Sequence, residues 1–330
     1  MPVLTVIMPV YNGEKFLKES IDSILAQTFE DFTLIIVNDN STDGSQQIID
    51  HYISIDNRVC CLNNDINLGP AKSRNIAIET AKTELIALMD SDDIALPTRF
   101  EKQLDFLNSH TNVGVCGTWF TFFGDKKKII KHNISHEEIK VGFLDSCVVG
   151  NPTVMFRKSA LGSLRFNETM LVAEDYSLWS EAVHITEFHN IPESLLLYRW
   201  HKNNISTIKF ELLEKAEFEI RKKQLAHLGI ALNDANIEYY INAVNLRRGL
   251  SKNDIIKTIE ASKTLIGLNA SKHVYNQNLF ISHIDKVILR TIRNSKENNR
   301  SYYKYIKNES GYFSKMTTLD AVVLFFKCLF

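Results

Sequence analysis

The stretch that decides the predicted fold is Leu85-Ile86-Ala87-Leu88-Met89-Asp90-Ser91-Asp92-Asp93. A short apolar run that ends in turn residues is typical of a buried β-strand. Three carboxylates at the end of such a strand are costly to bury unless a cation meets them. Because carboxylate oxygens suit Mg2+ or Mn2+, we predict a divalent-metal site here. The alternative is a solvated acidic turn that caps the following helix.

The rest of the first ~120 residues alternates between apolar runs and segments with apolar residues at helical spacing. The apolar runs cover residues 4–8, 33–37, 59–62, 85–88 and 113–119. This alternation predicts an α/β fold, a Rossmann-like and mostly parallel sheet flanked by helices. Ligands bind such sheets beyond the carboxyl ends of the strands. The turn Pro9-Val10-Tyr11, Asp39 and the acidic stretch 90–93 all fall there, so we predict one site at that edge.

Two common phosphate-binding motifs are missing from the sequence. No strand-to-helix turn reads Gly-x-Gly-x-x-Gly, and no P-loop follows the first strand. A diphosphate would therefore have to be held by a metal and by basic side chains.

The composition indicates an ordinary globular protein and excludes a strongly charged one. The chain has 330 residues, 45% of them apolar and 23% charged, with a net charge of -1. We therefore expect no nucleic-acid partner. An odd set of five cysteines without a Cys-x-x-Cys pair predicts reduced, mostly buried thiols. Neither a signal peptide nor a run of 18 apolar residues is visible, so we expect a cytoplasmic protein.

Five short motifs follow one another along the first two thirds of the chain. They are Pro9-x-Tyr11-Asn12, Asp39 with Ser41-Thr42-Asp43-Gly44, Asn67-x-Gly69 with Arg74-Asn75, Asp90-Ser91-Asp92-Asp93, and Glu174-Asp175. In this order they resemble the motifs of the inverting glycosyltransferases of family 2, which have the GT-A fold and often build bacterial surface polysaccharides such as O-antigen. The resemblance covers about residues 1–210. It departs at Asn38-Asp39-Asn40, where the family usually has Asp-Asp-Gly, which removes one acid and a flexible glycine.

The resemblance implies a UDP-sugar donor and assigns roles to individual residues. Asp39 would accept a hydrogen bond from uracil or ribose, although it could instead cap the next helix. Arg74 would contact the diphosphate; the alternative is a surface ion pair. Asp92 and His201 would bind Mn2+ or Mg2+, although a lone histidine can also be structural. The predicted donor-binding set is Pro9, Tyr11, Asn12, Asp39, Arg74, Asp90, Ser91 and Asp93, with Asp90 near ribose or metal-bound water, and Asp93 either orienting Arg74 or touching the sugar.

Asp175 is the predicted general base, and Glu174 is predicted to bind an acceptor hydroxyl. Inverting transfer needs one carboxylate near the acceptor hydroxyl, opposite the leaving group. The alternative is that both acids merely complement the dipole at a helix N-terminus. Trp179, further along that helix, could stack on a sugar, but a helix aromatic is more often part of the core.

From residue 211 to residue 330 the pattern predicts a mainly helical C-terminal region beside the transferase domain of residues 1–210. Residues 271–330 carry a surplus of six basic charges, and the stretch 321–330 is mostly apolar. It is too short to span a bilayer, but it could lie at the membrane interface; a core-docking helix or a homodimer contact is the alternative. A peripheral membrane contact would suit an undecaprenyl-diphosphate-linked acceptor.

Two other functions compete with glycosyl transfer. A nucleotidyltransferase would want a glycine-rich basic loop after the first strand, and residues 9–15 offer only Gly13 and Lys15. A non-catalytic nucleotide-sugar-binding module would not need both acidic clusters, so the sequence favours the enzyme.

Overall fold

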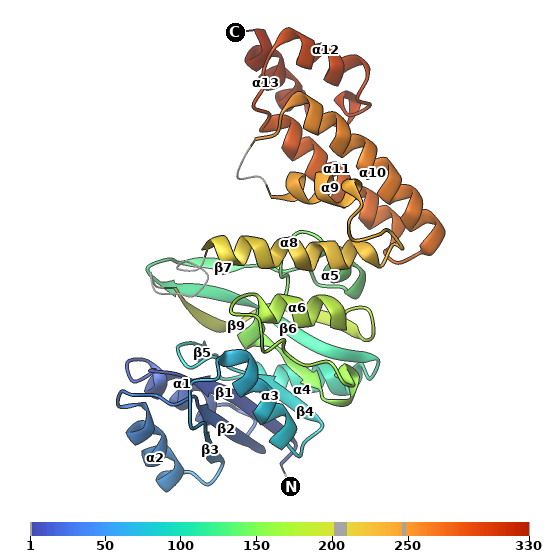
Figure 1. Cartoon of the computed structure of the whole chain (residues 1–330). Helices are drawn as coiled ribbons and strands as arrows, with labels where there is room; N and C mark the ends of the chain where they lie inside the picture. Colours follow the sequence, from blue (N-terminus) through green and yellow to red (C-terminus); the bar gives the residue numbers. More distant parts are fainter. Residues whose placement is uncertain (1, 201–209, 246–248, 330) are drawn as a thin grey trace. The chain divides into compact units, whose positions relative to one another are not determined.

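The computed structural model describes residues 2–200, 210–245 and 249–329 (Figure 1). The chain divides into two compact units, Met1–Glu217 and Phe218–Phe330. Our division of the sequence into domains after residue 210 stays a prediction.

The first unit is built on one nine-stranded sheet, which confirms the α/β class. Its parallel part is predicted correctly and has the order β3 (Val59–Asn63), β2 (Phe32–Asn38), β1 (Leu4–Val10), β4 (Leu85–Leu88). The sheet continues through β8 (Met155–Arg157), β6 (Val113–Gly124), β9 (Glu187–Trp200) and β5 (Ile94–Ala95). β8 and β5 run antiparallel to their neighbours, and β7 (Lys128–Ile130) forms a hairpin with β6.

Helices cover both faces of this sheet (Figure 1). Successive strand residues point to opposite faces, and in β1 and β4 nearly all of them are buried, so both faces need a covering layer. On one face, Leu4, Val6 and Met8 of β1 share a core with apolar residues of α1 (Leu17–Leu25), α2 (Ser45–Ile55) and α4 (Arg99–Ser109). On the other face lie α3 (Pro70–Thr80), which packs on β1 and β2, α5 (His136–Gly142), and α6 (Glu174–Ala182).

Trp179 anchors α6 to the sheet as a core residue, not as a sugar platform. It is fully buried, and its ring meets Phe156 of β8 and Phe188 of β9 edge-on. The indole nitrogen donates to Asn151 Oδ1 at 3.1 Å. This packing fixes the N-terminus of α6, where Glu174 and Asp175 lie, against the sheet.

The second unit is helical, as predicted, and has a core of its own. Its helices are the C-terminal part of α8 (Phe210–Ala226), α9 (Ala235–Val244), α10 (Lys252–Lys272), α11 (Gln277–Arg293), α12 (Arg300–Asn308) and α13 (Thr318–Leu329). Side chains of Ser251, Asn276 and Asn299 cap α10, α11 and α12 at their N-termini. The apolar side of α11 is buried, including Phe280, Ile284 and Val287. Of the helices in the described ranges, none has the length and apolarity that crossing a bilayer requires.

The five cysteines are free thiols, but only Cys116 and Cys328 are buried, fewer than we predicted. Cys60 is exposed, and the other two are half-buried.

In the turn after β2, Asn40 occupies the position at which the resembled glycosyltransferases usually have glycine. Asn40 has a φ of 58°, in the left-handed region that L-residues avoid. Asparagine tolerates this region better than other non-glycine residues, since its short polar side chain can bond locally. The loop therefore keeps the backbone geometry that a glycine would otherwise supply.

Asn40→Val should lower the free energy of unfolding by about 1–2 kcal/mol, because a β-branched residue is strained at positive φ. Asn40→Gly, the matched control, should change it much less, since glycine adopts this φ freely. Urea unfolding measures both. An equal loss in the two variants would show that the side chain, not the backbone, matters here.

Candidate functional site

The candidate site lies at the carboxyl ends of β1, β2 and β4, where parallel register brings three loops together. Register pairs Pro9 with Val37 and Ile7 with Leu88, so the segments that follow these strands emerge at one edge. A Cβ placed on Gly13 would lie 3.5 Å from Ser91 Oγ, which brings the first and third loops into contact. The sheet therefore gathers the predicted donor-binding residues as the sequence suggested.

The loop after β1 is fastened to the loop after β2. Asn12 Oδ1 accepts from Thr42 N at 2.8 Å, and Gly13 N donates to Ser45 Oγ at 2.9 Å. Asn12 itself has a φ of 52°. Tyr11, in the same loop, is 53% exposed. Asn12 thus shapes the edge, while the ring of Tyr11 stays accessible to a ligand.

Asp39 is buried and orders the segment that leads into α3. Its Oδ1 accepts from Asn64 Nδ2 at 2.7 Å and from Leu68 N at 2.8 Å. Its Oδ2 accepts from Gly69 N at 2.8 Å. The capping alternative is wrong, since Asp43 accepts from Ser45 N at the start of α2. Contact of Asp39 with a base stays a prediction, and the carboxylate oxygens keep lone pairs for it.

Arg74 joins the two acidic clusters of the site. Its Nη2 donates to Asp90 Oδ1 at 2.8 Å, and its Nη1 donates to Glu174 Oε1 at 2.9 Å. The side chain is only 6% exposed, so the surface ion pair we considered is wrong. Burial lowers the pKa of Arg74, but attraction to Asp90 and Glu174 outweighs it and raises the pKa. One guanidinium thus holds acids from β4 and α6 within reach of each other.

Asp175, the predicted base, lies beside this bridge. Burial and then the negative charge of Glu174 raise the pKa of Asp175 to about 7, against the opposing effects of Tyr176 N–H and Arg74. Tyr176 N donates to Asp175 Oδ1 at 2.7 Å. Ala173, the residue before the helix, has a φ of 57°, a strained conformation for alanine. An acid with a pKa near 7 is suited to accept a proton at neutral pH.

Asp93 is held by β9, not by Arg74. Its buried Oδ1 accepts from Arg199 N at 2.8 Å, and its Oδ2 has no partner in the described structure. Burial and the charges of Asp92 and Asp90 raise the pKa of Asp93 well above its ordinary value. Of our two roles for Asp93, orienting Arg74 is therefore not seen: Asp90 and Glu174 do this.

Sequence reasoning missed Arg199, the residue that fastens the acidic stretch to β9. Its Nε donates to the Asp92 carbonyl oxygen at 2.8 Å, and its Nη2 pairs with Glu19 at 2.5 Å. The guanidinium lies over the rings of Phe16 and Phe123, at 4.1 and 4.4 Å. No local motif marks it, because its partners lie more than a hundred residues away.

Tyr198, also in β9, is a second residue that the sequence did not reveal. Burial raises the pKa of its phenol, and the charges of Asp93, Asp90, Asp92 and Asp175 raise it further. The ring packs against Phe120 and Phe122 of β6. The negative charges of both acid groups therefore act on this one hydroxyl.

A third residue that we did not predict, Arg99, contacts the end of β4, just before the acidic stretch. It is fully buried and donates to the Leu88 carbonyl oxygen at 2.8 Å and to Gln103 Oε1 at 3.0 Å. Burial lowers the pKa of Arg99 to about 9, although Asp93 opposes the shift. Gln103 in turn donates to carbonyl oxygens of Cys116 and Thr153, which ties the end of β4 to β6 and to the turn Asn151–Thr153 before β8.

The metal ligands Asp92 and His201 stay predictions. His201 lies outside the described residues, and Asp92 is half-buried. In residues 2–200, 210–245 and 249–329, no three His, Cys, Asp or Glu side chains are grouped to hold a metal. This donor set still suits Mg2+ or Mn2+, which usually bind one or two carboxylates together with substrate phosphates. Asp92 provides such a carboxylate at the edge of the sheet, and Asp90, which pairs with Arg74, lies in the same acidic stretch.

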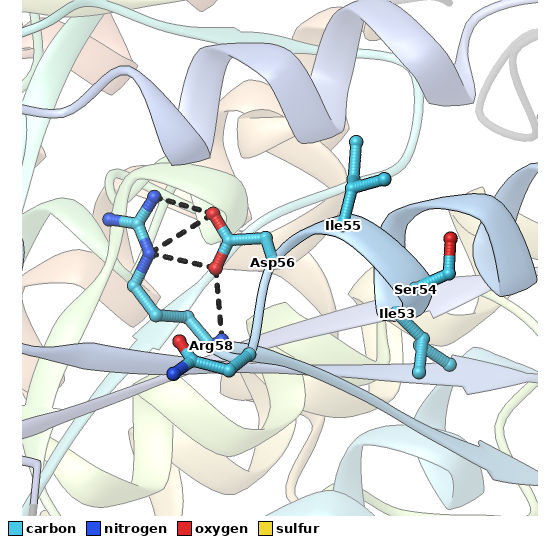
Figure 2. Close-up of a pocket in the computed structure, with 6 residues that line it drawn as sticks. Ile53, Ser54, Ile55, Asp56 and Arg58 are labelled. Carbon is cyan, nitrogen blue, oxygen red and sulfur yellow. Dashed lines mark hydrogen bonds and ion pairs between the residues drawn. The ribbon is translucent and has the colours of Figure 1, made fainter.

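A separate hollow, lined by residues 53–58, lies at the turn between α2 and β3 (Figure 2). Its two charged side chains, Asp56 and Arg58, pair with each other at 2.8 Å. It lies at the amino end of β3, whereas the acids gather at the carboxyl ends of the strands. We therefore do not assign a ligand to it.

Comparison with known proteins identifies the family. Residues 5–165 match the profile of Glycosyl transferase family 2. The O-antigen biosynthesis glycosyltransferase WbnJ of Escherichia coli is 32% identical over 231 residues, which cover 67% of this chain and 89% of WbnJ. This chain belongs to glycosyltransferase family 2. Membership favours glycosyl transfer over the nucleotidyl transfer that we weighed as an alternative.

Two solved structures confirm the GT-A fold of this transferase. S. aureus TarS 1-349 in complex with UDP-GlcNAc has a TM-score of 0.60 at 19% identity, covering 88% of this chain and 90% of the other. The mannosyltransferase PcManGT from Pyrobaculum calidifontis, in complex with GDP-Man and Mn2+, has a TM-score of 0.53 at 14% identity, covering 100% and 87%. At these identities the likeness shows the fold alone.

Arg199→Gln should lower the free energy of unfolding by about 1.5–3 kcal/mol, because the Asp92 carbonyl loses a charged donor. It should also weaken donor binding, since the acidic stretch is no longer fixed to β9. Arg157→Gln is the matched control: Arg157 donates to the Leu107 carbonyl oxygen at 2.8 Å, away from the acids. Urea unfolding and calorimetric titration with nucleotide sugars separate the effects. Equal donor affinity in the two variants would contradict a positioning role.

Proposed function

We propose that this protein is an inverting, metal-dependent glycosyltransferase that uses a UDP-sugar. It would move a hexose or N-acetylhexosamine to a hydroxyl of a lipid-linked glycan during surface polysaccharide synthesis. The observation that carries the proposal is the Arg74 bridge, which brings Asp90 and Glu174 to one guanidinium. Asp90, which we expect to bind the donor, and Glu174, which we expect to bind the acceptor, are thereby held by the same side chain.

In the proposed reaction, Asp175 takes the proton of the acceptor hydroxyl as its oxygen attacks the anomeric carbon. A bond from that oxygen to the anomeric carbon forms on one face while the bond to the UDP oxygen breaks on the other, which inverts the configuration. UDP leaves with the bonding electron pair. Arg74 would contact the diphosphate, and Glu174, which holds Arg74, would bind an acceptor hydroxyl and so align the acceptor with the donor.

Asp92 and His201 are the residues we expect to bind a divalent cation, with Asp90 near ribose or metal-bound water. When bound, Mn2+ or Mg2+ would neutralise the charge that develops on the departing diphosphate. The Mn2+ bound to PcManGT, a protein of the same fold, supports this part of the proposal. The role of His201 stays a prediction.

Donor and acceptor are inferred from the relatives. TarS binds UDP-GlcNAc and WbnJ takes part in O-antigen biosynthesis, which favours a UDP-sugar and a surface glycan. PcManGT binds GDP-Man, so a GDP-sugar is the alternative donor. An undecaprenyl-diphosphate-linked acceptor would keep the enzyme at the cytoplasmic face of the membrane.

Asp175→Asn should abolish transfer, lowering UDP release by roughly a hundredfold to ten-thousandfold, because the acceptor loses its base. UDP binding should stay close to that of the wild type. Asp105→Asn, which changes an exposed acid in α4, is the control. A coupled assay of UDP release with a lipid-linked saccharide acceptor measures the rate. Wild-type rates from Asp175→Asn would remove the base assignment, and no release from wild type with any donor would favour the non-catalytic binding module.

The wild-type rate should rise with pH and level off above about pH 7. The pKa of Asp175 is raised to about 7, and only the deprotonated acid accepts a proton, so activity is lost as pH falls through that value. The groups around it are Glu174, Arg74 and Asp90, with the Cys147 thiol and the Tyr198 phenol. UDP release measured from pH 5 to pH 9 checks this. A flat profile would assign the proton transfer elsewhere.

Asp92→Ala should weaken Mn2+-dependent binding of the donor. A ligand at one hundred times its dissociation constant stabilises the native protein by about 2.7 kcal/mol, and the variant should lose much of this. Thermal-shift assays with UDP-GlcNAc, other UDP-sugars and GDP-mannose, each with and without Mn2+, also rank the donors. Asp105→Asn again serves as control. An unchanged Mn2+-dependent shift in Asp92→Ala would remove it from the metal site.

A further inference from the structure

α13 is apolar on two sides, although only one side packs against its own unit. Leu324 and Cys328 are buried. Leu319 is 72% exposed and Phe326 is 55% exposed, and Val322 and Val323 are exposed between them. Positions 319, 322, 323 and 326 have the i, i+3, i+4, i+7 spacing of a single helix face. We call these four side chains the outer stripe; such an exposed apolar stripe is typical of an interaction surface.

Aromatic and basic side chains of α12 adjoin this helix. The ring of Tyr303 lies 5.5 Å from that of Phe325, which is exposed beside the outer stripe. Lys307 Nζ lies 5.8 Å from the centre of the Tyr303 ring. A lysine, a tyrosine and a phenylalanine thus follow one another from the charged surface of α12 to α13.

The charge around the outer stripe is basic. Asp320, the one acid within α13, pairs with Arg293 at 2.6 Å, so its negative charge is compensated. Lys304 and Lys307 on α12 are exposed. Residues 271–330 as a whole carry a surplus of six basic charges.

We propose that the outer stripe, with Tyr303 and Lys307 beside it, is a peripheral membrane-binding surface for a bilayer that contains anionic lipid. A helix with an apolar face, aromatic residues and flanking lysines lies in the plane of the membrane interface. Long lysine side chains reach the headgroups while neighbouring apolar groups enter the acyl region. A second copy of this chain suits the surface less well, because a two-fold contact would bring two basic surfaces together. This proposal rests on the proposed function in one respect: a lipid-linked acceptor would explain why the enzyme binds a membrane.

The test is flotation of the full chain with vesicles of phosphatidylcholine and phosphatidylglycerol, compared with phosphatidylcholine alone. The stripe variant Leu319→Gln/Val322→Gln/Phe326→Gln should bind the anionic vesicles more than about tenfold more weakly, because apolar insertion is lost. Glutamine is a good helix former, and the three positions are exposed, so the thermal unfolding curve should not shift downward. Leu232→Gln, at an exposed apolar position of the same unit outside α13, is the matched control and should bind like wild type.

Lys307→Gln tests the electrostatic part separately. It should weaken binding to the anionic vesicles about fivefold and leave the weak binding to phosphatidylcholine unchanged. Raising the salt concentration should reduce the difference between Lys307→Gln and wild type, since salt screens exposed charges.

Three results would overturn the proposal: wild type that does not float with anionic vesicles, a stripe variant that floats like wild type, or a lipid-free dimer that the stripe variant abolishes. The last, measured by light scattering, would assign the surface to a second copy. UDP-GlcNAc thermal shifts are recorded on the same proteins without lipid. Their absence in wild type would count against the proposed donor and would leave the membrane surface standing.

Discussion

The arrangement of the candidate site depends on the buried Arg74 guanidinium, which lies between Asp90 and Glu174. A guanidinium taken out of water is unfavourable unless its charge and its donors are matched, and two carboxylates supply most of that match. The match is incomplete, because Arg74 Nε is buried without a partner. Loss of either acid would leave a buried charge uncompensated. The bridge thus requires the carboxyl end of β4 and the N-terminus of α6 to meet at one place.

Backbone strain is concentrated around the same edge. Of the four non-glycine residues at positive φ in the described ranges, Asn12, Asn40 and Ala173 lie in the loops that carry candidate site residues. Such conformations persist only where surrounding contacts over-determine them. Here the contacts between the first two loops provide this for Asn12, and the burial of Trp179 fixes the helix that follows Ala173. The scaffold holds the edge in a shape that its loops would not adopt alone.

The sequence predicted what depends on local pattern and missed what depends on distant pairs. Apolar runs located the parallel strands, and acids at strand ends indicated the site, because parallel register alone brings those ends together. Arg199 could not be found this way, since its contacts with Asp92 and Asp93 arise only when β5 pairs with β9. The hydrogen bond between Arg199 N and Asp93 was missed for the same reason, and contact of Asp93 with the sugar stays a prediction. Periodicity also showed that α13 is apolar, but not which of its two apolar sides packs inward.

The pKa of Asp175 results from opposing effects of the groups around it. Burial and Glu174 favour the protonated acid, whereas Arg74 and the Tyr176 N–H favour the carboxylate. Without Arg74 the pKa of Asp175 would be higher still, whereas in water its pKa would be that of an ordinary carboxylate. The guanidinium that joins the two clusters therefore also favours the ionised form of Asp175, against the larger effects of burial and Glu174. Glu174 acts on its neighbour in two opposed ways: its charge favours the protonated acid, and it holds the cation that favours the carboxylate.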